Sequence, residues 1–173
     1  MKLDTTTWLC GPPPASGQRQ RYPSRFEFNL IKHYPQVLSE PCLHMFSGSL
    51  DSSSKIRGWT TDIRPETGAD IISPYDELPE SLHGMGIVIA DPPYNAGFGS
   101  RWIGENADAA LPRPKHIAAQ AMKVLKPGGL FLLLHIIILP AYKDLGMERI
   151  ALHPILTGPN NAIRVLNVMR KAP

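Results

Sequence analysis

An apolar run, Gly86-Ile87-Val88-Ile89-Ala90, stops abruptly at the step Asp91-Pro92-Pro93-Tyr94. An unbroken apolar run of this length is typical of a strand buried on both faces, as in the middle of a parallel sheet. The strand cannot continue through the prolines, because neither carries the N–H group that a sheet ladder requires. The sequence therefore predicts a central parallel strand that ends in a rigid acid–Pro–Pro–aromatic step.

The rest of the chain alternates strand-like and helix-like patterns, which predicts an open α/β sheet. Residues 147–156 and 162–169 flank the turn-forming segment 157–161 and predict a terminal antiparallel hairpin. With the hairpin we expect a mostly parallel sheet of seven strands. The other strands are expected over residues 42–46, 55–61, 69–72, 86–90 and 130–138, and a second helix over 114–125.

A first helix is expected to start near residue 24. Ser24 and Glu27 have the spacing of a capping box, in which the two side chains satisfy backbone N–H groups at the helix start. Phe26, Leu30 and Tyr34 then lie four residues apart on one face.

Length and composition limit the class of protein. The chain has 173 residues, of which 43% are hydrophobic and 19% charged, and this suits one globular domain, 24–173, after a flexible N-terminal arm, 1–23. A net charge of +3 allows an anionic partner without requiring one. Cys10 and Cys42 have no metal-ligand spacing, so no metal is expected. The start of the chain has no signal-peptide pattern and the apolar stretch 129–139 is too short for a membrane span, which predicts a cytoplasmic protein without a membrane partner.

Four residues follow or end the predicted parallel strands: Gly48, Asp62, Ile72 and Asp91. Open α/β sheets bind their ligands at the carboxyl ends of the strands. We therefore expect these four residues to share one edge of the sheet and to form a binding site.

From about residue 42 to the C-terminus, the chain resembles the S-adenosylmethionine-dependent amino-methyltransferases with a D/N/S-P-P-Y/F/W signature. The resemblance rests on "LHMFSGS", "TTDIRP", "ADIISPYDELP", "DPPY" and "AMKVLKPGGLFLLL", which occur in the family's order. It implies a Rossmann-like class I methyltransferase fold, S-adenosyl-L-methionine as cofactor, and methylation of an exocyclic amine of a nucleic-acid base.

The resemblance assigns the signature to catalysis, that is Asp91, Pro92, Pro93 and Tyr94. The Asp91 carboxylate and the Pro92 carbonyl would accept the amine hydrogens, which localises the nitrogen lone pair, and Tyr94 would stack on the base. Asp62 would accept hydrogen bonds from the cofactor ribose. The full set of implied cofactor contacts is Phe46, Ser47, Gly48, Asp62, Ile63, Ile72, Asp76 and Asp91.

Two features depart from the family pattern. Leu50 stands where the last glycine of the F-x-G-x-G turn belongs, and the segment 49–55 is too short for a helical crossover between parallel strands. The substrate contacts are expected outside the motifs, at Asn95, Arg101 and Trp102.

Three functions stay open on sequence alone. The first is an adenine-N6 methyltransferase of DNA that binds its substrate as a homo-oligomer. It is favoured because the signature begins with Asp. The second is an RNA base methyltransferase, and the third is a non-catalytic binding protein that kept the fold. His135 is expected to be a core histidine rather than a catalytic one.

Overall fold

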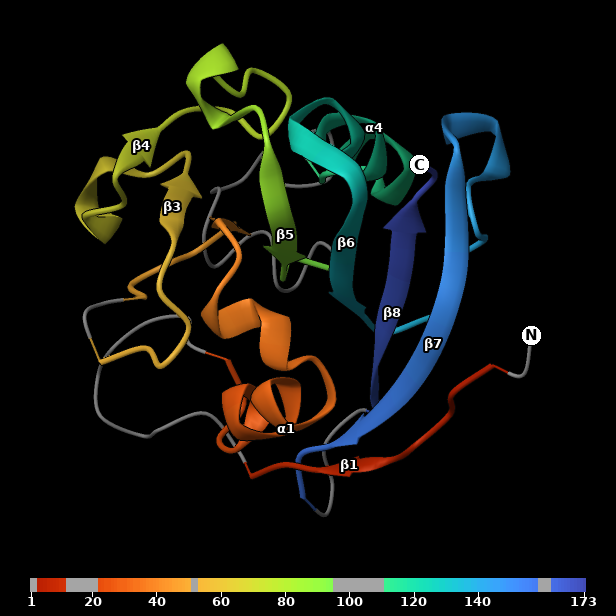
Figure 1. Ribbon diagram of the computed structural model, residues 1–173. Helices are drawn as coiled ribbons and strands as arrows, with labels where there is room; N and C mark the ends of the chain where they lie inside the picture. The colour runs from red at the N-terminus through yellow and green to blue at the C-terminus, as the bar shows by residue number, and fades with distance from the viewer. Residues whose placement is uncertain (1–2, 12–21, 51–52, 95–110, 159–162) are drawn as a thin grey trace.

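The computed structural model of the chain describes residues 3–11, 22–50, 53–94, 111–158 and 163–173. Its centre is an eight-stranded sheet with the order β1-β7-β8-β6-β5-β2-β3-β4 (Figure 1). Neighbouring strands are parallel except where β8 pairs with β6 and β7, so the C-terminal hairpin is antiparallel as predicted. The strands are β1 Trp8–Leu9, β2 Cys42–Met45, β3 Trp59–Asp62, β4 Ile71–Ile72, β5 Met85–Ala90, β6 Leu125–His135, β7 Met147–Leu156 and β8 Arg164–Lys171.

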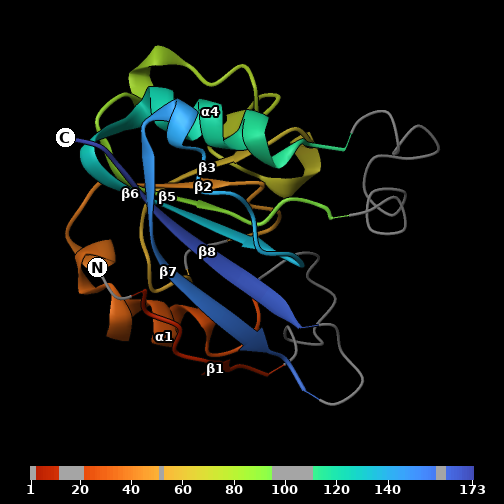
Figure 2. The ribbon, with the colours of Figure 1, turned by 90° about the vertical axis from the view of Figure 1, so that its right-hand side faces the viewer.

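Helices cover both faces of the sheet. Figure 2 shows α1 on one side and α4 on the other. In β5, Ile87 and Ile89 pack into the core on the α1 side, while Val88 and Ala90 pack into the core on the α4 side. This alternation explains the unbroken apolar run, because both faces of β5 are covered. The described helical segments are α1 Phe26–His33 and α4 Pro114–Val124, with short 3-10 turns at Pro35–Leu38, Pro65–Thr67, Glu80–Leu82 and Lys143–Leu145.

The predicted capping box is wrong. The residue before α1 is Arg25, in a left-handed conformation with φ 64°, and no side chain caps the helix. Glu27 instead accepts hydrogen bonds from the Ser54 hydroxyl at 2.5 Å and from the Lys55 backbone N–H at 3.1 Å. A tertiary contact has taken the carboxylate that local spacing assigned to the cap.

The first crossover is short, as predicted. Between β2 and β3, the described residues 46–50 and 53–58 contain no helix. The side chain of Ile56 is 1% exposed and joins the core under α1. The Glu27 contacts with Ser54 and Lys55 therefore tie α1 to a crossover that has no helix of its own in its described part.

Part of the predicted N-terminal arm belongs to the sheet. Trp8 and Leu9 pair in parallel with Ile155 and Leu156 of β7. The Trp8 side chain is 1% exposed and stacks on the ring of His153 at a centroid distance of 4.6 Å. This strand is the eighth, and a two-residue strand has no periodicity from which it could be predicted.

Among the described residues, no helix is long and apolar enough to cross a membrane. Their His, Cys, Asp and Glu side chains form no group suited to a metal ion.

Candidate functional site

The carboxyl ends of the parallel strands meet at one edge of the sheet. Met45 of β2 pairs with Thr61 of β3 and with Ala90 of β5. Asp62 pairs in the same way with Ile72 of β4. The residues predicted to share an edge therefore do so, with Asp91 directly after β5.

The Asp91 carboxylate is the centre of a contact network at this edge. The Tyr94 hydroxyl donates a hydrogen bond to Oδ1, and the Arg164 guanidinium lies 3.6 Å from Oδ2. The guanidinium carbon of Arg164 also lies 5.4 Å from the centroid of the Tyr94 ring. On another side, the Tyr94 ring meets the His135 ring edge-on at 5.2 Å. Three strand ends thus supply one compact cluster.

Burial dominates the electrostatics of this cluster. It raises the pKa of Asp91 above the ordinary range, although the Arg164 charge and the Tyr94 hydrogen bond act in the opposite direction. It also raises the pKa of Tyr94 well above its ordinary value, and the Asp91 charge adds to that effect. Tyr94 is therefore a protonated donor at neutral pH. Pro92, between them, is buried, and Pro93 is half-buried.

The turn after β2 has an unusual backbone. Phe46 and Gly48 both adopt left-handed conformations, with φ 57° and 55°. Ser47 between them is 7% exposed, and its Oγ has no hydrogen-bond partner among the described residues. The backbone N–H of Gly48 donates to Asp62 Oδ2 at 3.0 Å, so the turn and the acid of β3 are in direct contact.

The Asp62 carboxylate already has a full set of donors. Oδ1 accepts from the Arg64 backbone N–H and from Arg64 Nε, each at 3.0 Å. Oδ2 accepts from Gly48 N–H at 3.0 Å and from an Arg64 terminal nitrogen at 3.2 Å. A carboxylate offers about four lone-pair sites, so these donors saturate it.

Three other predicted cofactor contacts follow Asp62 in the chain. Ile63, next to Asp62 in the chain, is 58% exposed, and Ile72, which pairs with Asp62, is 45% exposed, so two apolar side chains near the acid lie at the surface. Asp76 is exposed and follows Tyr75, whose ring lies 5.6 Å from the Phe46 ring. The predicted substrate contacts, Asn95, Arg101 and Trp102, lie outside the described residues.

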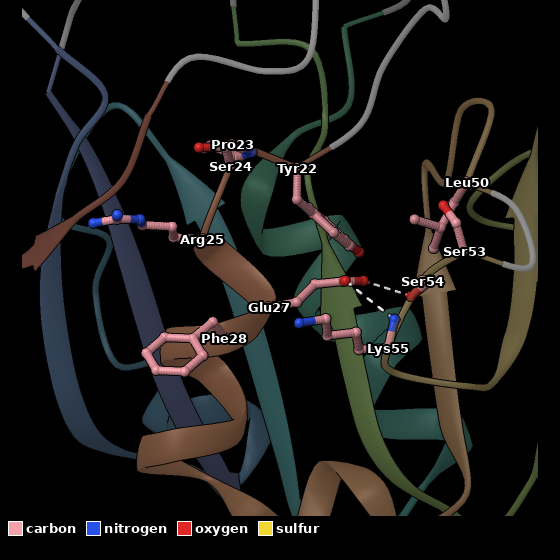
Figure 3. A pocket seen from close by; sticks show the side chains of 10 residues that line it. All are labelled: Tyr22, Pro23, Ser24, Arg25, Glu27, Phe28, Leu50, Ser53, Ser54 and Lys55. Atoms are coloured by element: carbon pink, nitrogen blue, oxygen red, sulfur yellow. Dashed lines mark hydrogen bonds between the residues drawn. The ribbon is translucent and has the colours of Figure 1, made fainter.

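A cavity of about 230 Å³ lies between α1 and the short first crossover (Figure 3). Glu27, with its bonds to Ser54 and Lys55, forms part of the wall, and Tyr22 lines another part. Burial raises the pKa of Tyr22 well above its ordinary value, with smaller contributions from Cys42 and Asp91. Tyr22 therefore lies within electrostatic range of the Asp91 carboxylate.

The site contains three residues that the sequence reasoning missed or read differently: Arg64, His135 and Arg164. His135 is buried as expected, but its ring contacts Tyr94 rather than lying apart from the site. Arg164 had one available signal. In an antiparallel hairpin, the first residue of the last strand returns to the edge where the parallel strands end.

Comparison with known proteins supports the fold. No family model and no curated protein matches the chain. TrmN from Thermus thermophilus superimposes with a TM-score of 0.61 at 17% identity, over 90% of this chain and 51% of that one. The N-methyltransferase NodS from Bradyrhizobium japonicum gives 0.54 at 8% identity, over 86% and 97%, and the putative methyltransferase yhhF from Escherichia coli gives 0.52 at 14%, over 94% and 90%. The chain spans about half the length of the TrmN structure, and it has the Rossmann-like fold of these proteins.

Proposed function

We propose that the protein is an S-adenosylmethionine-dependent methyltransferase that acts on an exocyclic amine of a nucleic-acid base, with adenine N6 of DNA as the first candidate. The observation that carries the proposal is the convergence of Gly48, Asp62 and the step Asp91-Pro92-Pro93-Tyr94 on the carboxyl edge of the sheet. NodS, which shares the fold, has been solved with S-adenosyl-l-homocysteine.

The residues present fit the cofactor in most respects. Ser47 offers a buried hydroxyl without a partner in the described structure, next to a glycine turn that a ligand can approach closely. Ile63 and Ile72 expose apolar surface suited to the two faces of an adenine ring. When bound, the cofactor supplies an electrophilic methyl group. Asp62 is the exception, because Arg64 must release it before a ribose can bind there.

The Asp91 cluster suits an amine that is a poor nucleophile. A carboxylate oxygen that accepts an amine hydrogen localises the nitrogen lone pair, and the Pro92 carbonyl provides a second acceptor on a fixed backbone. Methylation leaves the nitrogen with one proton too many, and Asp91 is placed to accept it. Its raised pKa makes Asp91 a better proton acceptor than an ordinary aspartate.

Cofactor affinity tests the proposal at Asp62. Asp62→Ala is expected to weaken binding of S-adenosyl-l-homocysteine by about 1.5–3 kcal/mol, the scale of hydrogen bonds to a charged group. Arg64→Ala is expected to tighten it, because the ribose then meets a carboxylate without the guanidinium. Isothermal titration calorimetry measures both, with Glu66→Ala, an exposed acid two residues beyond Arg64, as the matched control.

Two results of this titration would contradict the proposal. Absence of binding by the wild type at millimolar ligand would remove the cofactor assignment. Wild-type affinity in Asp62→Ala would leave the cofactor in place and remove only the ribose role of this acid.

One observation favours a second function. Asp62 is saturated by its donors and the first crossover contributes no helix in its described part, so a non-catalytic binding protein with this fold is the second candidate. For the methyltransferase function, an RNA base remains the alternative substrate, because the proposed contacts of the Asp91 cluster are with the amine and do not distinguish DNA from RNA. Homo-oligomerisation and substrate contacts from Asn95, Arg101 and Trp102 remain part of the first proposal.

A further inference from the structure

Arg164 reaches the site from the antiparallel strand of the hairpin. His135, the last residue of β6, pairs with Val165 of β8. Arg164 precedes Val165 and is the first residue of β8, so it lies at the edge where β5 and β6 end. The hairpin thus brings a cation to the carboxyl edge from a part of the chain more than seventy residues after Asp91.

Arg164 lies close to both the Asp91 carboxylate and the Tyr94 ring of the signature step. Its terminal nitrogen lies 3.6 Å from Asp91 Oδ2, a distance that suits an ion pair but is longer than a hydrogen bond. Oδ2 therefore keeps lone-pair capacity for a further donor, unlike either oxygen of Asp62. The same guanidinium lies over the Tyr94 ring at 5.4 Å, and the Arg164 and Asp91 side chains are each 19% exposed.

The other groups around Asp91 cannot replace this charge. Tyr94 and Tyr22 carry neutral hydroxyls at physiological pH, and burial raises the pKa of both still further from neutrality. His135 of β6, which contacts Tyr94, has a pKa lowered by burial. His44 of β2, bonded to Tyr22, has a pKa lowered to about 4. Among the described residues of this cluster, Arg164 is the group that is positively charged at neutral pH.

We propose that Arg164 is a positioning residue of the methyl-transfer site, which keeps the Asp91 carboxylate charged with Oδ2 open to the target amine and holds the Tyr94 ring against His135. The role in transfer rests on the proposed function. The coupling between Arg164 and Asp91 does not, because it follows from the contacts alone.

The test compares Arg164→Gln, Arg164→Lys and the control Arg170→Gln, an exposed arginine on the same strand. Carbon-13 NMR follows the titration of the Asp91 carboxyl in the full chain, and thermal melting verifies folding. Arg164→Gln should move the Asp91 titration to higher pH, and Arg170→Gln should leave it unchanged. Arg164→Lys should keep the Asp91 titration near its wild-type position, because lysine retains the positive charge. It loses the planar group that lies over Tyr94.

Kinetics provide the second readout. In Arg164→Gln, the acid limb of kcat should move to higher pH in step with Asp91, with a loss of up to about 100-fold from misplacement of the reacting groups. An Asp91 titration or a kcat–pH profile in Arg164→Gln that superimposes on the wild type would overturn the proposal. If the titration moves but the wild type transfers no methyl group, the proposed function fails while the coupling stands.

Discussion

Replacing Asp91 with alanine is expected to lower the kcat of methyl transfer by roughly 10²–10³-fold. The carboxylate acts on the amine as its nitrogen loses planarity, so the lost interaction belongs to the transition state and substrate affinity should change little. The magnitude follows from about 3–4 kcal/mol for one preorganised electrostatic contact. Single-turnover rates at saturating nucleic acid measure the effect.

Tyr94 provides the matched controls for this experiment. Tyr94→Phe keeps the ring under Arg164 and removes the hydroxyl that donates to Asp91, so its rate should stay within about tenfold of the wild type. Tyr94→Ala removes the aromatic face on which the base would stack, so we expect a severe loss of the methyl-transfer rate. If the step were only a strand-ending turn, these variants would lower the melting temperature rather than the rate. A folded Asp91→Ala protein that methylates at the wild-type rate would refute the amine-acceptor role.

The free energy of unfolding should fall by about 3 kcal/mol between pH 7 and pH 4 through His44 alone. His44 is fully buried in β2, where its Nε2–H donates to the Ile56 carbonyl at 3.1 Å and its Nδ1 accepts from the Tyr22 hydroxyl at 3.0 Å. Burial lowers its pKa from 6.5 to about 4. The unfolded chain therefore binds a proton as pH falls below 6.5 while the folded chain does not, and a difference of this size corresponds to about 3 kcal/mol.

Urea unfolding at both pH values measures this contribution against two variants. His44→Gln can keep one donor and one acceptor but cannot titrate, so it should lose about that much of the pH dependence. His116→Gln, on an exposed position of α4, should retain the wild-type dependence. Equal pH dependence in the wild type and in His44→Gln would show that the buried imidazole does not supply this contribution.

The shared edge of the site could be predicted because it depends only on the identity and direction of the parallel strands. Parallel strands all end at the same side of a sheet, so Gly48, Asp62, Ile72 and Asp91 had to meet once their strands were identified. The apolar run before Asp91 identified the central strand, and turn residues identified the hairpin. These features are local, and local patterns are what a single sequence displays most clearly.

The features that could not be predicted arise from tertiary contacts. Glu27 binds the first crossover instead of capping α1, although its spacing from Ser24 suited a cap. Arg64 folds back on Asp62 from two residues away, and nothing in the letters "DIR" distinguishes that from a solvent-exposed arginine. Trp8 is part of a strand because its backbone pairs with β7 and its side chain stacks on His153.

Methyl transfer to an amine of a nucleic-acid base is tested most directly with methyl-labelled S-adenosylmethionine. The wild type and Asp91→Ala are each incubated with separate pools of DNA, RNA and protein, and the products are digested and identified by mass spectrometry. We expect the wild type to label DNA, with the label recovered as N6-methyladenine, and Asp91→Ala to give little label. Label in protein only, or no transfer to any pool by a wild type that binds the cofactor, would contradict this expectation.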